Sequence, residues 1–239
     1  MSEVLVDKRE LLLGESLGSI VAGVRGADRI FEEFKLDFCC GGDISLGAAI
    51  EEKDLGEEEI VERLMKLLEE NSTAAVMVDW RKEDPLKLID YILEVHHTFD
   101  REELTTIQRL LDKVLRAHYK KHPELLGKIN KLFYSLKMEL DEHFLKEEQV
   151  LFPMLAEYFS LDVKDEVKLK EIEAYINETE EEHDGAGSIL EEIDEVTEGY
   201  TVPEGGCRTF ELLYSHIREL TMDIHKHIHL ENSVLFKML

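Results

Sequence analysis

The chain contains the stretch His143-Phe-Leu-Lys-Glu147-Glu-Gln-Val-Leu-Phe and, further on, the similar stretch His227-Ile-His-Leu-Glu231-Asn-Ser-Val-Leu-Phe. In each stretch a histidine precedes a glutamate by four residues, which places both side chains on one face of an α-helix. Imidazole and carboxylate groups suit iron, manganese or zinc, and a carboxylate can bridge two metal ions. The two pairs therefore predict a metal centre between helices.

Apolar residues around these pairs recur at helical spacing and predict four long helices. They are expected over 85–121, 124–159, 164–199 and 207–237. Short connections make neighbouring helices antiparallel, so the expected fold is all-α, with an up-down four-helix bundle. In the first helix the apolar face is expected to consist of Leu88, Ile92, Val95, Phe99, Leu104, Ile107, Leu111 and Leu115.

Three residues are predicted to shape the long helices. Asp84 and Asp162 are expected to cap the first and third helices, because an aspartate side chain accepts hydrogen bonds from exposed N–H groups there. Pro153 lies inside an apolar run and is expected to kink or weaken the second helix.

Residues 1–78 have a different pattern, with several glycines and shorter helical stretches. Four short helices are predicted over 16–24, 27–34, 46–53 and 57–70, followed by a linker over 71–78. We therefore expect two domains, a small helical domain over 1–78 and the bundle over 79–239.

The depth of each histidine along its helix selects two further ligands, His97 in the first helix and His183 in the third. His118 is excluded, because it follows His97 by 21 residues, which is about 31 Å along a continuous helix. Glu139 and Glu182 are weaker candidates for orienting ligands. The predicted metal ligands are His97, His143, Glu147, His183, His227 and Glu231. The histidines assigned to the surface or to supporting positions are His96, His122, His216, His225 and His229.

The charge balance excludes several kinds of partner. Lys and Arg number 28 against 54 Asp and Glu, which gives a formal net charge of −26. Such a surface repels phosphate backbones and anionic lipids, so neither nucleic acid nor a membrane is expected as a partner. No stretch has the length of a membrane span, no secretory signal is evident, and three cysteines predict no disulfide framework. A cytoplasmic protein is therefore expected.

Together, five motifs resemble those of the di-iron proteins for repair of iron centres, which rescue iron–sulfur clusters after oxidative or nitrosative damage. The resemblance extends over nearly the whole chain. Proteins of this family pair a small cysteine-bearing N-terminal domain with a haemerythrin-like bundle. The motifs are LDFCCGG at 36–42, DWR at 79–81, HFLKEEQVLFP at 143–153, EEHDGAG at 181–187 and HIHLENSVLF at 227–236.

The resemblance implies that the metal is iron, in a non-haem di-iron centre with oxo and carboxylate bridges. Glu147 and Glu231 would be the bridging carboxylates, and the four histidines would be terminal ligands. It also implies damaged iron–sulfur proteins as partners, nitric oxide and O₂ as small ligands, a role in the stress response and a homodimer.

The chain departs from oxygen-carrying haemerythrins at two positions. Those proteins place a histidine where this sequence has Gly187, and an aspartate five residues after the last histidine, where Glu231 here follows after four. Fewer ligands favour nitric oxide binding or loss of an iron over reversible oxygen carriage.

Cys39 and Cys40 are adjacent, so their Cα atoms are about 3.8 Å apart, closer than an unstrained disulfide allows. They are either two buried apolar side chains or a thiol pair that takes iron, nitric oxide or electrons from the bundle. Gly41 and Gly42 would permit close approach of this loop. We assign Cys39 and Cys40 the transfer role, and Cys207 none.

Three functions remain open from the residues. The preferred one is a repair factor that donates iron or removes nitric oxide. An enzymatic alternative reduces two molecules of nitric oxide to nitrous oxide at the same site. The third is a sensor of O₂ or nitric oxide, in which the small domain reports ligand binding.

Overall fold

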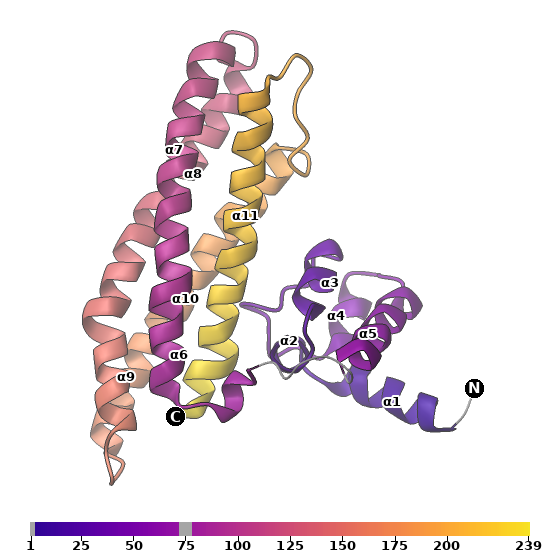
Figure 1. Ribbon diagram of the computed structural model, residues 1–239, viewed down its shortest axis with the longest axis vertical. Helices are drawn as coiled ribbons and strands as arrows, with labels where there is room; N and C mark the ends of the chain where they lie inside the picture. The colour runs from indigo at the N-terminus through magenta and orange to yellow at the C-terminus, as the bar shows by residue number, and fades with distance from the viewer. Residues whose placement is uncertain (1–2, 72–77) are drawn as a thin grey trace. The chain divides into compact units, whose positions relative to one another are not determined.

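The structure, a computed structural model, describes residues 3–71 and 78–239 (Figure 1). Over these ranges the regular structure is helical, and an isolated β-bridge joins Ser16 and Ser45. The all-α prediction is confirmed. Most of the linker predicted over 71–78 lies outside the described residues. Within them, no helix is long and apolar enough to cross a membrane.

Two compact units make up the chain. One unit consists of Met1–Leu88 together with Lys226–Leu239, and the other is Ile89–His225. The last long helix is continuous across this division, since it begins in one unit and ends in the other.

The N-terminal part of the first unit is a cluster of short helices. Serine side chains cap two of them, since Ser16 accepts a hydrogen bond from the Ser19 N–H at 3.2 Å and Ser45 accepts one from the Ala48 N–H at 3.3 Å. Buried apolar residues such as Phe31 fill the core of this cluster. The helices are α1 (Glu3–Gly14), α2 (Leu17–Gly23), α3 (Ala27–Glu33), α4 (Leu46–Glu52) and α5 (Glu57–Asn71).

The four short helices predicted from the sequence are confirmed to within one residue at each end. Helix α1 was not predicted, because its apolar residues do not follow one helix face. Leu11, Leu12 and Leu13 are consecutive, so they point in different directions around the helix.

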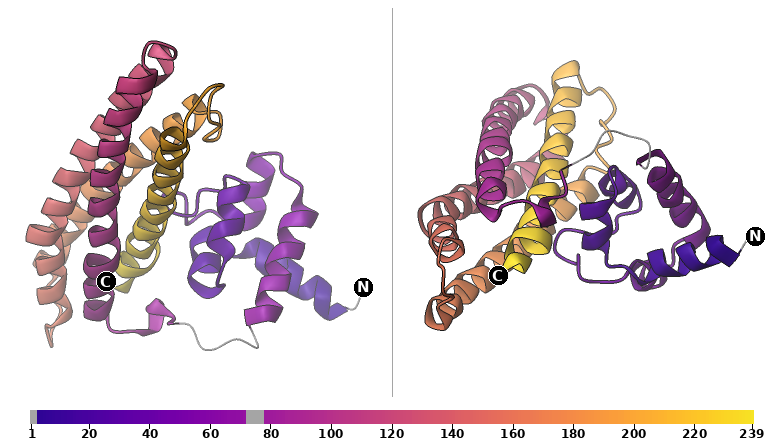
Figure 2. Two further views of the ribbon diagram at one scale, coloured as in Figure 1. Left: turned by 45° about the horizontal axis from the view of Figure 1, so that its top comes forward. Right: turned by 60° about the horizontal axis from the view of Figure 1, so that its bottom comes forward.

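The second unit contains most of the length of the long helices of a bundle, and Figure 2 shows α7, α8, α10 and α11 beside one another. All four predicted long segments are confirmed, although three of them are interrupted by turns of π-helix. The first segment comprises α6 (Pro85–Tyr91), η2 (Ile92–His97) and α7 (Thr98–His118), and the second comprises α8 (Pro123–Lys146), η3 (Glu147–Leu151) and α9 (Phe152–Phe159). The third is α10 (Glu166–Val196), and the fourth comprises α11 (Arg208–Leu230), η4 (Glu231–Leu235) and η5 (Phe236–Met238).

The π-helical turn η2 overturns one expectation about the core. Val95 was expected on the apolar face but is 41% exposed, while His96 and His97 are 4% and 0% exposed. A π-turn has wider i→i+5 hydrogen bonding and therefore shifts the face that a strict α-helix would present. The side chains within η2 consequently rotate out of their predicted register, whereas Leu104, Ile107 and Leu111 beyond it are buried as expected.

Pro153 lies two residues beyond the π-turn in the second segment, whereas the matching turn η4 forms without a nearby proline. Proline lacks an N–H group, and its ring crowds the carbonyl four residues before it, so the α-helical pattern fails on its N-terminal side. The N–H of Phe152 bonds to the carbonyl of Glu147, five residues back. The predicted weakening is thus confirmed as a wider turn, with the helix continuing on either side.

The predicted cap of the third helix at Asp162 is wrong. Helix α10 begins at Glu166, and the Asp165 side chain accepts hydrogen bonds from the N–H groups of Val167 at 2.9 Å and Lys168 at 3.2 Å. The cap predicted at Asp84 is confirmed, since its carboxylate accepts a bond from the Leu86 N–H at 3.0 Å.

Replacing Asp165 by alanine is expected to lower the free energy of unfolding by about 1 kcal/mol, because two N–H groups at the start of α10 lose their acceptor. Asp162→Ala is the matched control and should change it by less than about 0.5 kcal/mol. Urea denaturation followed by circular dichroism measures both. Equal losses in the two variants would contradict this assignment of the cap.

Candidate metal centre

All six predicted ligands have side chains withdrawn from solvent. The carboxylates Glu147 and Glu231 are 0% exposed, and the most accessible histidine, His143, is only 5% exposed. Burial of an ionised carboxylate is strongly unfavourable unless positive charge or hydrogen bonds compensate it. Two such groups in one core require a specific compensating environment.

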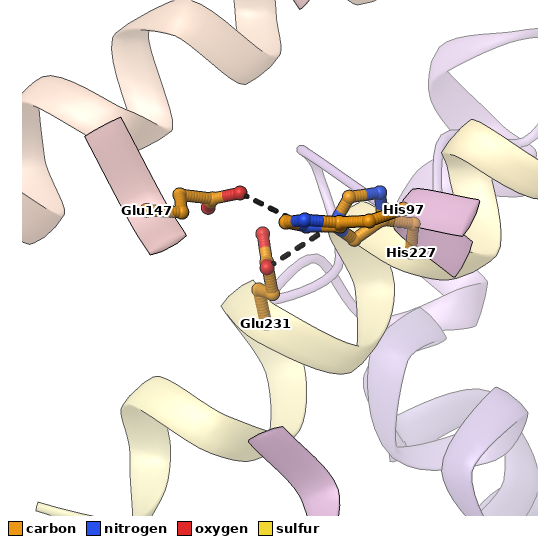
Figure 3. A group of neighbouring side chains, drawn as sticks. All are labelled: His97, Glu147, His227 and Glu231. Carbon is orange, nitrogen blue, oxygen red and sulfur yellow. Dashed lines mark hydrogen bonds and ion pairs between the residues drawn. The ribbon is translucent and has the colours of Figure 1, made fainter. Parts of the chain in front are cut away.

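Ligand atoms of these residues gather into two groups. One contains His97, Glu147, His227 and Glu231, and the other contains His143, Glu147, His183 and Glu231. Within each group the atoms lie within 4.8 Å of one another. Figure 3 shows the first group, with both carboxylates directed toward the imidazole rings. Each group therefore has two histidines of its own and shares the two glutamates.

Individual contacts define these groups further. Oε2 of Glu147 lies 3.3 Å from Nε2 of His97 and 3.2 Å from Nε2 of His143. Nε2 of His183 lies 3.3 Å from that of His143. A single carboxylate thus faces histidines from two different helices.

Three ligands lie at the boundaries of π-helical turns. His97 is the last residue of η2, and Glu147 and Glu231 are the first residues of η3 and η4. A π-turn adds a residue to the turn and re-aims the side chains beside it, which is why such turns are frequent at functional sites. In each His–Glu pair the histidine lies on regular α-helix, and the π-helical turn begins at the glutamate.

The carboxylate of Glu148 forms a hydrogen bond with Nδ1 of His97, the ring nitrogen that faces away from Glu147. Nδ1 of His97 lies 2.8 Å from Oε1 of Glu148, which also accepts a hydrogen bond from Nη1 of Arg101 at 2.6 Å. Burial alone raises the pKa of Glu148, but the bonds with Arg101 and His97 outweigh it and hold the pKa below its ordinary value. An ionised Glu148 keeps the proton of His97 on Nδ1 and leaves Nε2 available to a metal ion.

His143 has the same arrangement. Its Nδ1 lies 2.9 Å from Oε2 of Glu182, while Nζ of Lys146 donates to Oε1 of Glu182 at 2.9 Å. The bond with His143, assisted by Lys146, lowers the pKa of Glu182 to about 2 despite partial burial. Glu182 thereby orients the ring as the sequence suggested, whereas Glu139 hydrogen-bonds with Ser135 on its own helix.

The donor set fits iron. Four imidazole nitrogens and two shared carboxylates are borderline and hard ligands, which suit Fe, Mn or Zn in the divalent state. Sulfur is absent from both groups. The carboxylates that hold the outer nitrogens of His97 and His143 are typical supports of metal-bound imidazole.

Sequence reasoning missed Glu148 and Arg101. Glu148 is adjacent to a predicted ligand, so on an isolated helix it points about 100° away from it. Only the position of His97 on the neighbouring segment gives this carboxylate a role. His96 is also buried, with Nδ1 2.8 Å from Oδ2 of Asp223, and therefore does not belong to the surface.

The excluded histidine His118 lies at the far end of α7, where Nε2 is 3.1 Å from Sγ of Cys207. That hydrogen bond lowers the pKa of the exposed Cys207 thiol to about 7. Neither residue belongs to the two ligand groups.

The Cys39–Cys40 pair lies on a loop organised by Asp37. Its Oδ1 accepts bonds from the N–H groups of Cys39 at 3.2 Å and Cys40 at 2.9 Å, and its Oδ2 accepts one from the Gly41 N–H at 2.9 Å. The two Sγ atoms are 3.8 Å apart, and both cysteines are free. Bonding with Cys40, then burial and the Asp37 carboxylate, raises the pKa of the Cys39 thiol.

Within the first unit this loop packs against the π-turn η4. Nδ2 of Asn232 donates to the carbonyl oxygen of Cys39 at 3.3 Å, and Asn232 directly follows Glu231. The approach is close at Gly42, where a Cβ atom would lie 2.6 Å from Oγ of Ser233 and 2.8 Å from the carbonyl oxygen of Phe38. A side chain at position 42 would therefore separate the loop from the turn.

Comparisons with known proteins agree with this architecture. Residues 87–239 match the family described as Hemerythrin HHE cation binding domain, and residues 13–68 match a family described as Domain of Unknown function (DUF542). The bundle thus belongs to the haemerythrin-type cation-binding domains.

Among curated proteins, the chain is 37% identical to "Iron-sulfur cluster repair protein YtfE" of Pectobacterium carotovorum subsp. carotovorum (strain PC1), over 93% of this chain and 95% of the relative. It is 34% identical to the proteins of the same name from Escherichia coli O17:K52:H18 and Shigella boydii serotype 4, over 93% of this chain and 94% of each. The chain belongs to the family of these iron–sulfur cluster repair proteins.

Glu148→Ala and Glu182→Ala are each expected to weaken iron binding about 10- to 100-fold, since loss of the outer carboxylate releases the ring that it orients. Competition with a chromogenic iron chelator measures the affinity. Glu139→Ala removes the same charge from the helix that carries His143 and should leave the affinity unchanged. A loss in Glu139→Ala equal to that in Glu182→Ala would show a general effect of charge instead.

Proposed function

We propose that this protein binds two iron ions between its bundle helices and repairs iron–sulfur clusters damaged by oxidative or nitrosative stress. The observation that carries the proposal is the sharing of Glu147 and Glu231 by two groups of ligand atoms, each with two histidines of its own. Two carboxylates common to two groups match the arrangement in which carboxylates bridge a pair of metal ions. The names of the curated relatives support the repair role.

The residues of this chain would divide the work as follows. His97 and His227 would hold one iron, His143 and His183 the other, and the two glutamates both. Glu148 and Glu182 would orient the rings of His97 and His143. Bound iron would supply a reservoir of iron for damaged clusters and binding positions for small ligands such as nitric oxide or O₂.

The bundle core around the ligands limits access by water. The ring of Phe144 lies 4.6 Å from that of His97 between centroids, and the guanidinium of Arg101 lies 5.2 Å from the centroid of Phe144. Phe152 lies on the same imidazole at 5.8 Å. The two phenylalanine rings lower the polarity around His97, and electrostatic interactions are stronger in such surroundings.

Cys39 and Cys40 would act in transfer, as acceptors of iron, nitric oxide or electrons. The raised pKa keeps the Cys39 thiol protonated at neutral pH, whereas Cys40 is partly exposed. Cys40 is therefore the thiol that meets an incoming partner first. We further propose that the protein works in the cytoplasm as a homodimer, with the modules 1–78 and 79–239 serving transfer and iron binding.

Replacing Glu147 or Glu231 by alanine is expected to abolish paired iron, since each glutamate belongs to both ligand groups. Iron analysis should give two irons per chain in the parent protein and fewer than one in each variant. Mössbauer spectra should lose their magnetic coupling, and reactivation of a nitric oxide-damaged [4Fe–4S] dehydratase should fall with it. Full reactivation by a variant that has lost its paired iron would refute the proposal.

The double variant Cys39→Ser with Cys40→Ser is expected to keep its full iron content, because neither thiol belongs to the histidine and glutamate groups. Its reactivation of the damaged dehydratase should fall several-fold. Cys207→Ser is the matched control and should retain both properties. Reactivation at the parent rate by the double variant would return these cysteines to a role in packing.

A further inference from the structure

A second cluster of metal-ligating side chains lies within the unit formed by Ile89–His225. It consists of Glu103 on α7 and of His216 and Glu219 on α11. One ligand atom from each residue lies within 4.8 Å of the other two. His216 and Glu219 are three residues apart and therefore share one face of their helix.

Contacts within the cluster hold its members in place. Nδ1 of His216 lies 2.7 Å from Oε2 of Glu103, and Oγ of Ser215 donates to Oε1 of Glu219 at 3.3 Å. The side chains of His216 and Glu103 are 29% and 13% exposed. The pair of His216 and Glu103 thus joins α7 and α11, and the cluster is still open to ions from solvent.

The cluster is distinct from the centre made by the six buried ligands. Glu103 follows His97 by six residues, and His216 precedes His227 by eleven. At the rise of an α-helix these separations are about 9 Å and about 16 Å. No single metal ion can be bound by both sets.

We propose that Glu103, His216 and Glu219 bind one divalent first-row transition metal ion at this second site. One imidazole and two carboxylates suit Mn²⁺, Fe²⁺ or Zn²⁺, and three protein ligands leave positions for water, as in open metal sites. When His216 bonds to ionised Glu103 its proton lies on Nδ1. A metal ion takes the place of that proton, and the neutral ring then carries its hydrogen on Nε2.

The surroundings favour cation capture. The chain has a formal net charge of −26, which raises the local concentration of divalent ions at its surface. Partial exposure and a small ligand set make the bound ion exchangeable, in contrast to ions held by the six ligands of the core. The expected property is a labile site.

The test is a titration of Mn²⁺ into protein whose iron content has first been shown to be full. The free aqua ion is followed by electron paramagnetic resonance, and Mn²⁺ has little preference for the thiols of the chain. We expect one Mn²⁺ per chain, displaced by Zn²⁺, which follows Mn²⁺ in the order of increasing affinity. His216→Ala should abolish binding, and Glu103→Gln and Glu219→Gln should each weaken it about tenfold or more, since one of three ligands is lost.

Glu102→Gln provides the matched control, because it removes the same charge from the exposed position next to Glu103. It should bind Mn²⁺ as the parent protein does. Unchanged iron content and helical circular dichroism establish that each variant is folded, and His216→Asn replaces His216→Ala if that variant loses helicity. The proposal is overturned if the parent binds no Mn²⁺, if the His216 variant binds it normally, or if Glu102→Gln weakens binding as much as Glu103→Gln.

Discussion

The main physical constraint on this fold is the burial of two carboxylates in its core. Glu147 and Glu231 have no exposed surface, and each lies among imidazole rings from the helices of the bundle. Removing an ionised carboxylate from water is so unfavourable that it persists only with compensating positive charge or hydrogen bonds. Cations bound between the two glutamates would supply that charge, so metal binding and the stability of the bundle are thermodynamically linked. The surrounding helices supply the histidines that lie next to the two carboxylates.

The π-helical turns lie next to the buried ligands and change the direction of the side chains there. An α-helix places residues i and i+4 on one face, which is enough to align His143 with Glu147. Directly after the glutamate, η3 widens, and at η4 the same happens after Glu231. Pro153 lies two residues beyond the first of these turns, and the second forms without a nearby proline. In η2 the ligand is the last residue of the turn. His97 is buried there, whereas Val95 is exposed.

Much of this architecture is predictable from sequence, because a helix repeats every 3.6 residues and apolar residues report that period. The long segments and the His–Glu pairs follow from it directly. The exposure of Val95 does not, because it depends on a π-turn that departs from that period. The same holds for Glu148, whose partner His97 is 51 residues away along the chain. The cap at Asp165 was missed because Asp162 offers the same chemistry three residues earlier, and sequence alone does not distinguish them.

Contacts within the first unit connect the ligand Glu231 with the cysteine pair. Asn232, the next residue along η4, bonds to the carbonyl oxygen of Cys39, and Gly42 allows the loop to reach Ser233. The loop itself is held by the Asp37 carboxylate, which accepts three backbone N–H bonds. The backbone that carries Glu231 is therefore joined to the thiol-bearing loop by the Asn232 side chain. One peptide bond and one side chain would thus be enough to couple Glu231 to the cysteine pair, although neither cysteine belongs to the histidine and glutamate groups.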